Sequence, residues 1–387
     1  MNKITLVLFF LSFLNIFIAM VGYPLFIKLL GKMYVNRTIK KDYYHKPTVT
    51  IMVVAHNEEK VIEEKLKNIT KLDYPKDKIK YIVTSDFSTD GTNDIVYNFI
   101  NSHEDYDIRL YQTQNRKGKT NAQNEAQKTV ETDFLVMTDA NSFLDSNSIS
   151  EIMATFVSDD IAYVTGRLIY TNDQSVAGKS EISYWDSEIQ TRFVEGRIQT
   201  ITAGNGALYA CRNKDYVDFD LIESHDSAMP LYFSLQGRRA VSNNDACAYE
   251  KTGDTVQDEF KRKIRMNRII IRHILPTFRI LNIFKYKWFT IFYLGHRTAR
   301  YLLWISHAIL LITSILASSI HPVFTLILLL QVIFYLIAIM QQIFKFKNKF
   351  IVMIYYYSIT ILAQWIAVIK ILLGKSKPFW EKADSTR

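Results

Sequence analysis

Residues 48–71 read TVTIMVVAHNEEKVIEEKLKNITK, and this stretch decides the fold. Residues 48–55 form an apolar run that is typical of a buried β-strand. Beyond the polar residues that follow, Ile62, Leu66 and Ile69 recur at the spacing of one helical face. A strand followed directly by a helix is the unit from which mostly parallel sheets are built.

The same alternation continues along the chain, which predicts an α/β domain with a mostly parallel sheet. Further strands are expected at 79–85, 108–112 and 134–138, and further helices at 92–101 and 119–130.

A membrane anchor is expected before this domain. Residues 4–27 contain no Lys, Arg, Asp or Glu, and a run of roughly 20 apolar residues can cross a bilayer as a helix. Lys28 and Lys32 follow the run, so the basic flank would stay in the cytoplasm. Because no small-residue cleavage site follows a short apolar region, we predict an uncleaved transmembrane anchor over residues 1–32.

A second membrane region is expected after the domain. Residues 301–344 again lack charged side chains, with a turn at Pro322, and a further apolar run covers 350–369. We predict about three transmembrane segments within residues 301–373. The basic tail that follows favours the cytoplasm, whereas four crossings would place it outside, so the last segment is either a crossing or a re-entrant or interfacial one.

The charge and cysteine content limit the possible functions only loosely. Lys and Arg outnumber Asp and Glu by 47 to 38, and the resulting net charge of +9 suits polyphosphates, anionic lipids or nucleic acid. Nucleic-acid binding rests on charge alone and ranks last, so we expect no nucleic-acid partner. Cys211 and Cys247 are too few for a disulfide framework and fit a reducing, cytosolic setting.

Polar side chains follow several strands where these are expected to end. Asn57 and Glu58 come after the first strand, Asp86 after the second, and Asp139 with Asn141 after 134–138. In open α/β sheets, ligands bind beyond the carboxyl ends of the strands. Carboxylates gathered at one edge are costly unless a cation or hydrogen-bond donors offset their charge, and Mg²⁺ or Mn²⁺ bound to a nucleotide diphosphate would do so. As an isolated residue, Asp139 could equally be a turn or N-cap residue.

Three further segments have both a functional and a plain interpretation. Lys119, in NRKGKTNA, opens a helix and suits an anion, but it could lie in a solvated basic turn. Asp226 precedes an apolar helix and could be a catalytic base or an N-cap. Arg262 and Arg265 lie in KRKIRMNR, which could be a solvated face, a lipid contact or a phosphate clamp. Residues 269–298 fit an amphipathic interfacial segment.

Taken in order, these segments resemble the inverting glycosyltransferases of family 2, in particular the membrane-embedded kind that includes polysaccharide synthases and ceramide glucosyltransferases. AHNEE resembles the opening strand motif of the family, SDFSTDGT its DDGSTDGT segment, RKGKTNA its R-x-x-K segment and TDAN its DxD motif. GNGALYACR resembles the glycine-containing loop, SHD the TED segment and RKIRM the QxxRW segment. Seven motifs in series are specific, although each alone is weak.

The resemblance implies a Rossmann-like, nucleotide-sugar-binding type A glycosyltransferase domain over residues 47–268, in the cytoplasm beside the plasma membrane. By position, Asn57, Glu58 and Asp86 would hold the nucleoside, and Lys119 would lie near the base or the phosphates.

It also implies the reacting groups and the cofactor. Asp139 with Asn141 would bind Mg²⁺ or Mn²⁺, Asp226 would take the proton of the acceptor hydroxyl, and Arg262 with Arg265 would neutralise the departing diphosphate. Transfer with inversion requires a base, a metal ion and cations, and these residues would supply all three.

The sequence departs from the family pattern at Asn141, at His225, at Arg262 in place of Gln and at Met266 in place of Trp. The missing tryptophan removes a platform for an acceptor sugar and favours transfer of single sugars over processive synthesis. We therefore expect a hexosyltransferase of class EC 2.4 that moves a sugar from a UDP-sugar to a lipid-linked or polysaccharide acceptor. The alternative is a catalytically silent membrane scaffold.

Overall fold

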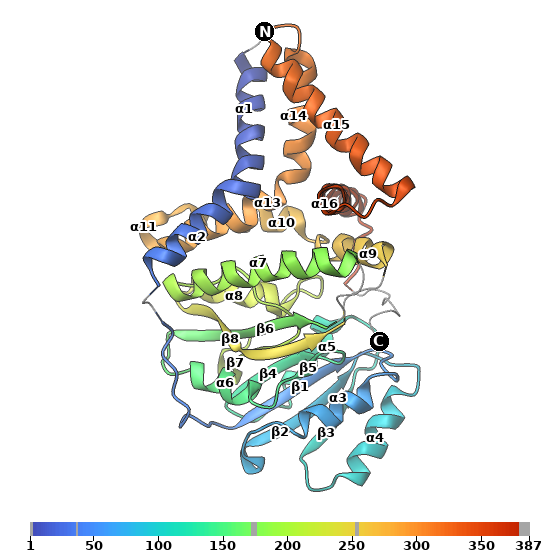
Figure 1. The fold of residues 1–387 in the computed structure, drawn as a ribbon. Coiled ribbons are helices and arrows are strands. Elements are labelled where there is room, and N and C mark those ends of the chain that lie inside the picture. The colour runs from blue at the N-terminus through green and yellow to red at the C-terminus, as the bar shows by residue number, and fades with distance from the viewer. Residues whose placement is uncertain (1–2, 36–37, 172–175, 252–254, 379–387) are drawn as a thin grey trace.

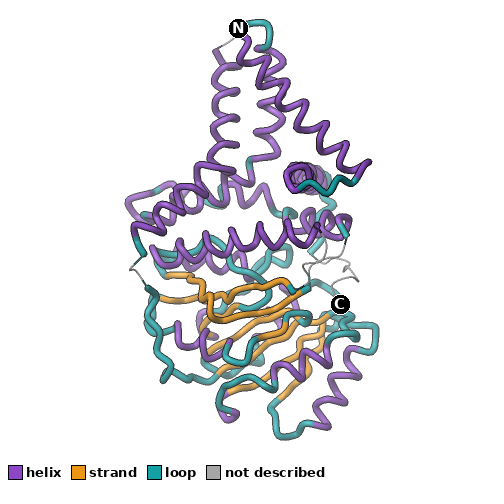
Figure 2. Tube along the Cα trace, viewed as in Figure 1, coloured by secondary structure: helices purple, strands orange, loops and turns teal. Residues whose placement is uncertain are grey.

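The computed structural model describes residues 3–35, 38–171, 176–251 and 255–378. From top to bottom in Figure 1, long helices lie above a middle layer of helices, and an eight-stranded sheet lies below them. Figure 2 shows the strands together in this lower part, apart from the long helices at the N-terminal end.

The sheet has two halves of different construction. Its strand order is β3-β2-β1-β4-β7-β6-β8-β5; β1 pairs with β2 and β4 in parallel, and β2 pairs with β3 in parallel. The bounds are β1 (Val49–Ala55), β2 (Ile79–Ser85), β3 (Ile108–Gln112), β4 (Phe134–Asp139), β5 (Phe143–Leu144), β6 (Ile161–Tyr170), β7 (Tyr209–Arg212) and β8 (Arg239–Glu250).

The predicted α/β fold class is confirmed, and the four strands predicted before residue 140 are present. The prediction of a mostly parallel sheet holds only for this half. Strand β7 pairs with both β4 and β6 in the antiparallel sense, and β5 pairs antiparallel with β8, so the sheet is mixed. The antiparallel strand β7 joins β4 to the parallel pair of β6 and β8.

Strand β1 shows that the centre of the sheet is buried on both faces. All of its residues are buried, and successive side chains of a strand point to opposite faces. Ile51 and Val53 pack with Ile62 of the helix that follows, whereas Met52 and Val54 pack with Ala122 on the opposite face. An apolar run of this kind is what a central parallel strand requires.

The helices of the domain cover these two faces. Helices α3, α4 and α6 contribute to the first core, and α5 and α8 to the second. Their bounds are α3 (Ile62–Ile69), α4 (Thr92–Ser102), α5 (Lys119–Gln127), α6 (Ser148–Thr155), α7 (Val176–Ile198), α8 (His225–Leu235) and α9 (Val256–Met266).

Helix α7 joins the sheet domain to the N-terminal helix. Figure 1 shows α7 and α8 between the sheet and the upper helices. Val194 and Ile198 of α7 pack with Tyr23, Ile27 and Leu30 of α2 in a small apolar core. The sheet domain is therefore attached to the upper helices by buried side chains.

Several long apolar helices are typical of an integral membrane protein. The helix over Lys3–Met33 and the helices Pro322–Phe344 and Lys349–Leu372 are each long and apolar enough to cross a membrane. A bent pair, Trp288–Tyr301 with Leu303–Ala317, makes up to four spans in the described part of the chain. The upper helices are α1 (Lys3–Phe17), α2 (Tyr23–Met33), α10 (Ile270–Ile274), α11 (Ile283–Tyr286), α12 (Trp288–Phe292), α13 (Ala299–Tyr301), α14 (Leu303–Ala317), α15 (Pro322–Phe344) and α16 (Lys349–Leu372).

The direction of α16 bears on the alternatives for the last apolar segment. In Figure 1, α1 and α14 are seen from the side, whereas α16 is seen end-on, so α16 crosses their direction steeply. It lies beside the middle layer rather than next to the tip of α1. This placement favours a re-entrant or interfacial α16 over a fourth parallel crossing.

Candidate active site

The loops that follow β1 and β2 are bonded to each other at the predicted edge of the sheet. The Nδ1 atom of His56 lies 2.7 Å from the carbonyl oxygen of Asp86. Asn57 has a left-handed backbone, with φ of 56°, and its Oδ1 accepts a hydrogen bond from the backbone N–H of Thr89 at 2.8 Å. Glu58 is buried, and its backbone N–H donates to Thr92 Oγ1 at 2.7 Å.

Asp86 fixes the loop that leads into α5. Its Oδ1 and Oδ2 accept hydrogen bonds from the backbone N–H groups of Lys117 (3.1 Å) and Gly118 (3.0 Å). Gly118 has φ of 101°, a conformation that glycine adopts without the strain of a Cβ. Because a carboxylate can accept about four hydrogen bonds, lone pairs remain for a nucleoside. Asp86 can therefore both hold this loop and contact the nucleoside of the sugar donor, as predicted.

Lys119 joins the start of α5 to the end of β4. Its Nζ donates a short hydrogen bond to Oδ1 of Asp139 at the end of β4. Burial lowers the pKa of Lys119, but the negative charges of Asp139 and Asp226 outweigh burial and leave the pKa raised. The solvated basic turn considered for this lysine is wrong, because its side chain is only 16% exposed and ion-paired.

The glycine-containing loop closes on this ion pair. A Cβ added to Gly206 would lie 3.0 Å from Oδ2 of Asp139 and 3.2 Å from Nζ of Lys119. A Cβ on Gly204 would lie 1.9 Å from Oη of Tyr163. Close approach thus requires a glycine at position 204, whereas a methyl group at position 206 would meet only the ends of the Asp139 and Lys119 side chains. The loop lies directly against the predicted metal ligand.

Asp226 lies in α8, on the other side of this loop. It lies in the first turn of α8 and not at the N-cap, which is Ser224, so the N-cap interpretation is wrong. Its carbonyl oxygen accepts hydrogen bonds from Gly204 N at 2.7 Å and from Tyr163 Oη at 3.3 Å.

A cation that the sequence reasoning did not single out lies near Asp226. Arg268 donates from Nε to the carbonyl oxygen of Ile222 at 2.6 Å. Burial lowers its pKa, and the charge of Asp226 acts in the opposite direction. The only sequence signal was its place at the end of the basic run KRKIRMNR.

The two arginines predicted to meet the diphosphate lie on α9. Arg262 forms a two-pronged ion pair with Glu259, with contacts of 2.7 and 2.9 Å. Burial raises the pKa of Glu259, but the Arg262 charge outweighs it and the pKa is lowered. The charge of Arg262 is therefore partly offset on its own helix, while Arg265 is partly buried in the last turn of α9.

The predicted metal ligands suit a cation that takes most of its other ligands from the substrate. Across the described part of the chain, no group of three or more His, Cys, Asp or Glu side chains is arranged to hold a metal ion. Asp139 is one-third exposed, and Asn141 follows it in a partly exposed turn. Mg²⁺ commonly uses one or two carboxylates together with substrate phosphates and water, so the residues present fit such an ion.

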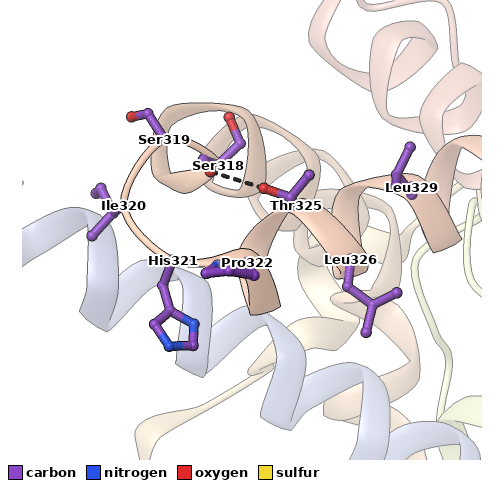
Figure 3. Close-up of a pocket in the computed structure, with 8 residues that line it drawn as sticks. All are labelled: Ser318, Ser319, Ile320, His321, Pro322, Thr325, Leu326 and Leu329. Carbon is purple, nitrogen blue, oxygen red and sulfur yellow. Dashed lines mark hydrogen bonds between the residues drawn. The ribbon is translucent and has the colours of Figure 1, made fainter.

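The surface hollow that Figure 3 shows is separate from this site. It lies at the turn between α14 and α15, at the end of the molecule remote from the sheet (Figures 1 and 3). Its lining is mainly apolar, and Thr325 Oγ1 donates to the carbonyl oxygen of Ser318 across it at 2.8 Å. It is lined by Ser318, Ser319, Ile320, His321, Pro322, Thr325, Leu326 and Leu329, none of them a predicted site residue.

Comparison with known proteins agrees with the order of motifs around this edge. The sequence model described as Glycosyl transferase family 2 matches residues 50–216, and that of Glycosyl transferase family group 2 matches residues 134–344. The chain belongs to glycosyltransferase family 2. It is accordingly a glycosyltransferase, an enzyme of class EC 2.4.

Among its relatives are poly-β-1,6-N-acetyl-D-glucosamine synthases. That of Staphylococcus epidermidis is 23% identical over 291 residues, which cover 69% of each chain. That of Staphylococcus aureus is 25% identical over 282 residues, 66% of this chain and 67% of the relative. In fold, the glycosyltransferase is similar to the mannosyltransferase PcManGT from Pyrobaculum calidifontis in complex with GDP-Man and Mn²⁺. The TM-score is 0.70, with 20% identity over 95% of this chain and 99% of that chain.

Proposed function

We propose that this glycosyltransferase moves a sugar from a UDP-sugar to a polysaccharide or lipid-linked acceptor, with inversion, in the synthesis of cell-envelope glycans or glycolipids. One observation carries the proposal: Lys119 is ion-paired with Asp139, and the glycine-containing loop joins this pair to Asp226. Gly206 of the loop lies against the ion pair, and the N–H of Gly204 donates to the carbonyl oxygen of Asp226 at 2.7 Å. These contacts support one shared site for a predicted metal ligand, a predicted base and a cation.

In the proposed reaction, the acceptor hydroxyl oxygen attacks the anomeric carbon of the donor. The bond from that carbon to the diphosphate breaks, its electron pair leaves with the nucleotide diphosphate, and Asp226 takes the hydroxyl proton. Mg²⁺ or Mn²⁺, held by Asp139 with Asn141, would offset the charge of the leaving diphosphate. In-line attack gives a β-linked product from an α-linked donor.

The remaining predicted residues fit donor binding in this scheme. Asn57 and Glu58 lie in the loop bonded to that of Asp86, on the side where the nucleoside would sit. Arg262 and Arg265 remain candidates for the diphosphate. Since Arg262 is paired with Glu259, we expect it to stabilise the diphosphate less than the partly buried Arg268, on which the charge of Asp226 also acts.

The membrane arrangement belongs to the same proposal. We assign residues 1–32 to the anchor, 47–268 to a cytoplasmic catalytic domain, 269–298 to the interface and 301–373 to the membrane region. In the interfacial segment, Phe278 and Phe284 are 81% and 92% exposed next to basic residues, as expected of side chains that enter lipid. Protease digestion of inside-out and right-side-out vesicles tests the sidedness, because only the cytoplasmic domain of inside-out vesicles should be cut.

The names of the relatives suggest which donors to test first. Purified protein in detergent is supplied with UDP-N-acetylglucosamine, UDP-glucose or GDP-mannose, with Mn²⁺ or with a chelator, and released nucleotide is measured. We expect Mn²⁺-dependent release from a UDP-sugar. Mass spectrometry of the product separates single transfer, which Met266 in place of tryptophan favours, from polymer synthesis, which the names of the relatives favour.

A matched pair of variants tests the base. Asp226→Asn should abolish transfer and leave the Kd for UDP with Mn²⁺ within about twofold, because uncharged asparagine cannot take the proton. Asp105→Asn, which removes an exposed partner of Lys76, should change neither quantity. Turnover retained in Asp226→Asn would remove the base assignment, and failure to bind any nucleotide would support the scaffold alternative.

A further inference from the structure

A second cluster of charged side chains lies away from the edge of the sheet, where α7 meets the upper helices. Its carboxylates and its histidine are almost completely buried, with side-chain exposures of 0–4%. Charges at such depth are costly unless they are paired and hydrogen-bonded. The members are Tyr23, Glu188, Arg192, Glu195, His296 and Arg300.

Glu188 is the centre of this cluster. Its Oε1 accepts from Nε and Nη2 of Arg192 at 3.1 and 3.0 Å and lies 2.9 Å from Nε2 of His296, while Oε2 accepts from Arg300 at 2.5 Å. Burial raises the pKa of Glu188, but these positive neighbours outweigh burial and hold the pKa well below its usual value. Glu188 is therefore a fixed negative charge.

His296 joins this carboxylate to the N-terminal helix. Its other ring nitrogen, Nδ1, lies 2.7 Å from Oε1 of Glu195, which also accepts from Oη of Tyr23 at 2.5 Å. A neutral imidazole has one N–H, whereas contact with two carboxylates requires two donors, so the ring is an imidazolium. A Cβ on Gly295 would lie 2.2 Å from the Tyr23 ring, so the anchor helix is seated closely here.

The remaining guanidinium nitrogen of Arg192, Nη1, connects this cluster to the candidate active site. Its Nη1 donates to the carbonyl oxygen of Gly204 at 2.6 Å, and the N–H of Gly204 donates to the carbonyl oxygen of Asp226 at 2.7 Å. Two residues further on, Gly206 lies against Asp139 and Lys119. One guanidinium thus connects the buried cluster to the loop between the predicted base and the predicted metal ligand.

We propose that Arg192 is a positioning residue, which holds the Gly204–Gly206 loop and, through it, keeps Asp226 in position relative to Asp139. The buried side chains of Glu188, His296 and Glu195 connect Arg192 to the membrane anchor. The catalytic part of the proposal rests on the proposed function. The guanidinium suits the task because its planar fork binds Glu188 with two donors and still presents another to Gly204. A lysine ammonium cannot keep the same directions, although it keeps the charge.

The experiment compares Arg192→Lys and Arg192→Met with Arg197→Met in the full-length protein in detergent. Arg197 is the matched control, because it lies on the same helix and also contacts the anchor, at the carbonyl oxygens of Gly31 and Val35. Two quantities are measured: amide hydrogen exchange of residues 202–208 and 224–230, and the split between kcat for sugar transfer and the Kd for UDP with Mn²⁺.

We expect faster exchange in both segments for the two Arg192 variants and not for Arg197→Met. The kcat should fall about 100-fold in Arg192→Met, as for a displacement of about 1 Å at a reacting group, and less in Arg192→Lys. The Kd for UDP should change by less than about threefold, since the nucleoside loops are not touched. A merely structural role would lower the amount of folded protein without this split.

Unchanged exchange and unchanged kcat in Arg192→Lys would overturn the proposal, even if Arg192→Met did not fold. Equal effects of the Arg192 and Arg197 variants would also overturn it, because they would show general loosening of α7. The exchange measurement does not depend on turnover. If the wild-type protein transferred no sugar, the proposed function would fail, while changed exchange in the Arg192 variants alone would still support the positioning of the loop.

Discussion

Gly204→Ala adds one methyl group at the contact between the glycine-containing loop and the core. The new Cβ would lie 1.9 Å from Oη and 2.8 Å from Cζ of Tyr163, and 3.1 Å from the carbonyl oxygen of Asp226. To reach an ordinary contact of 3.4 Å, the hydroxyl would have to retreat by about 1.5 Å. Tyr163 is fully buried and packs against Tyr209, with ring centroids 5.8 Å apart, so it has little space to move.

The expected cost combines overpacking with a weakened hydrogen bond from Tyr163 to Asp226. Overpacking a buried site costs about 1–3 kcal/mol, and a hydrogen bond contributes about 1 kcal/mol, so we expect a loss of about 3 kcal/mol. For a domain of this size that corresponds to a fall of about 10 °C in Tm. Since Gly204 of the loop is hydrogen-bonded to the backbone of Asp226, kcat should fall about 100-fold as well.

The assay is thermal unfolding in detergent, followed by nucleotide release at a temperature where all variants are folded. Adding Tyr163→Phe removes Oη and leaves Cζ, at 2.8 Å, as the nearest atom, so the double variant should recover roughly half of the lost stability. Gly22→Ala is the control, because its nearest neighbours lie at 3.5 Å. Wild-type stability and turnover in Gly204→Ala would refute the reasoning, as would strictly additive effects in the double variant.

Three further outcomes follow from single contacts. Gly295→Ala places a Cβ 2.2 Å from the ring of Tyr23 and should lower Tm through about 1–3 kcal/mol of overpacking; an unchanged Tm would show that the anchor helix shifts freely. The pKa of Lys65 is lowered from 10.5 to about 7, with burial as the main cause. The unfolded chain therefore keeps this proton between pH 7 and about 10 while the folded protein loses it, so stability should rise with pH there, and chemical denaturation of Lys65→Met should show a smaller rise. Asp139→Asn, or a chelator, should weaken binding of UDP with Mn²⁺ at least about tenfold in calorimetry, whereas equal affinity with and without metal would exclude Asp139 as its ligand.

The first half of the sheet could be predicted because its information is local. Apolar runs such as 79–85 are followed at once by helical patterns, and polar residues come directly after the carboxyl ends of these strands. The second half could not be ordered in this way. Strand β7 pairs with β4 across more than 70 positions, and its sense depends on how α7 folds back over the sheet, which no local pattern records.

The candidate site, too, could be predicted from the sequence only in part. Asp86, Asp139 and Asp226 could be found from strand ends and motif order, but the partner of each could not. Lys119 pairs with Asp139 because β4 ends and α5 begins at the same edge of the sheet, an arrangement that depends on the tertiary fold. Arg192 lies in the middle of a helix that matches no motif, and its role depends on a carbonyl oxygen, which has no sequence signature at all.

His225 shows why the altered motifs do not argue against turnover. It replaces the acidic middle residue of the family's segment, yet it is fully buried, between Oη of Tyr216 at 2.7 Å and Oε1 of Gln123 at 3.0 Å. Burial, with the charge of Lys119, lowers its pKa to about 3, so the side chain is neutral at physiological pH. The substitution therefore changes a hydrogen-bonded packing position and leaves the carboxylates that act on Lys119 in place, which are Asp139 and Asp226. Because a silent scaffold has no need for a carboxylate at both of these positions, the presence of Asp139 and Asp226 favours an enzyme that still transfers sugar.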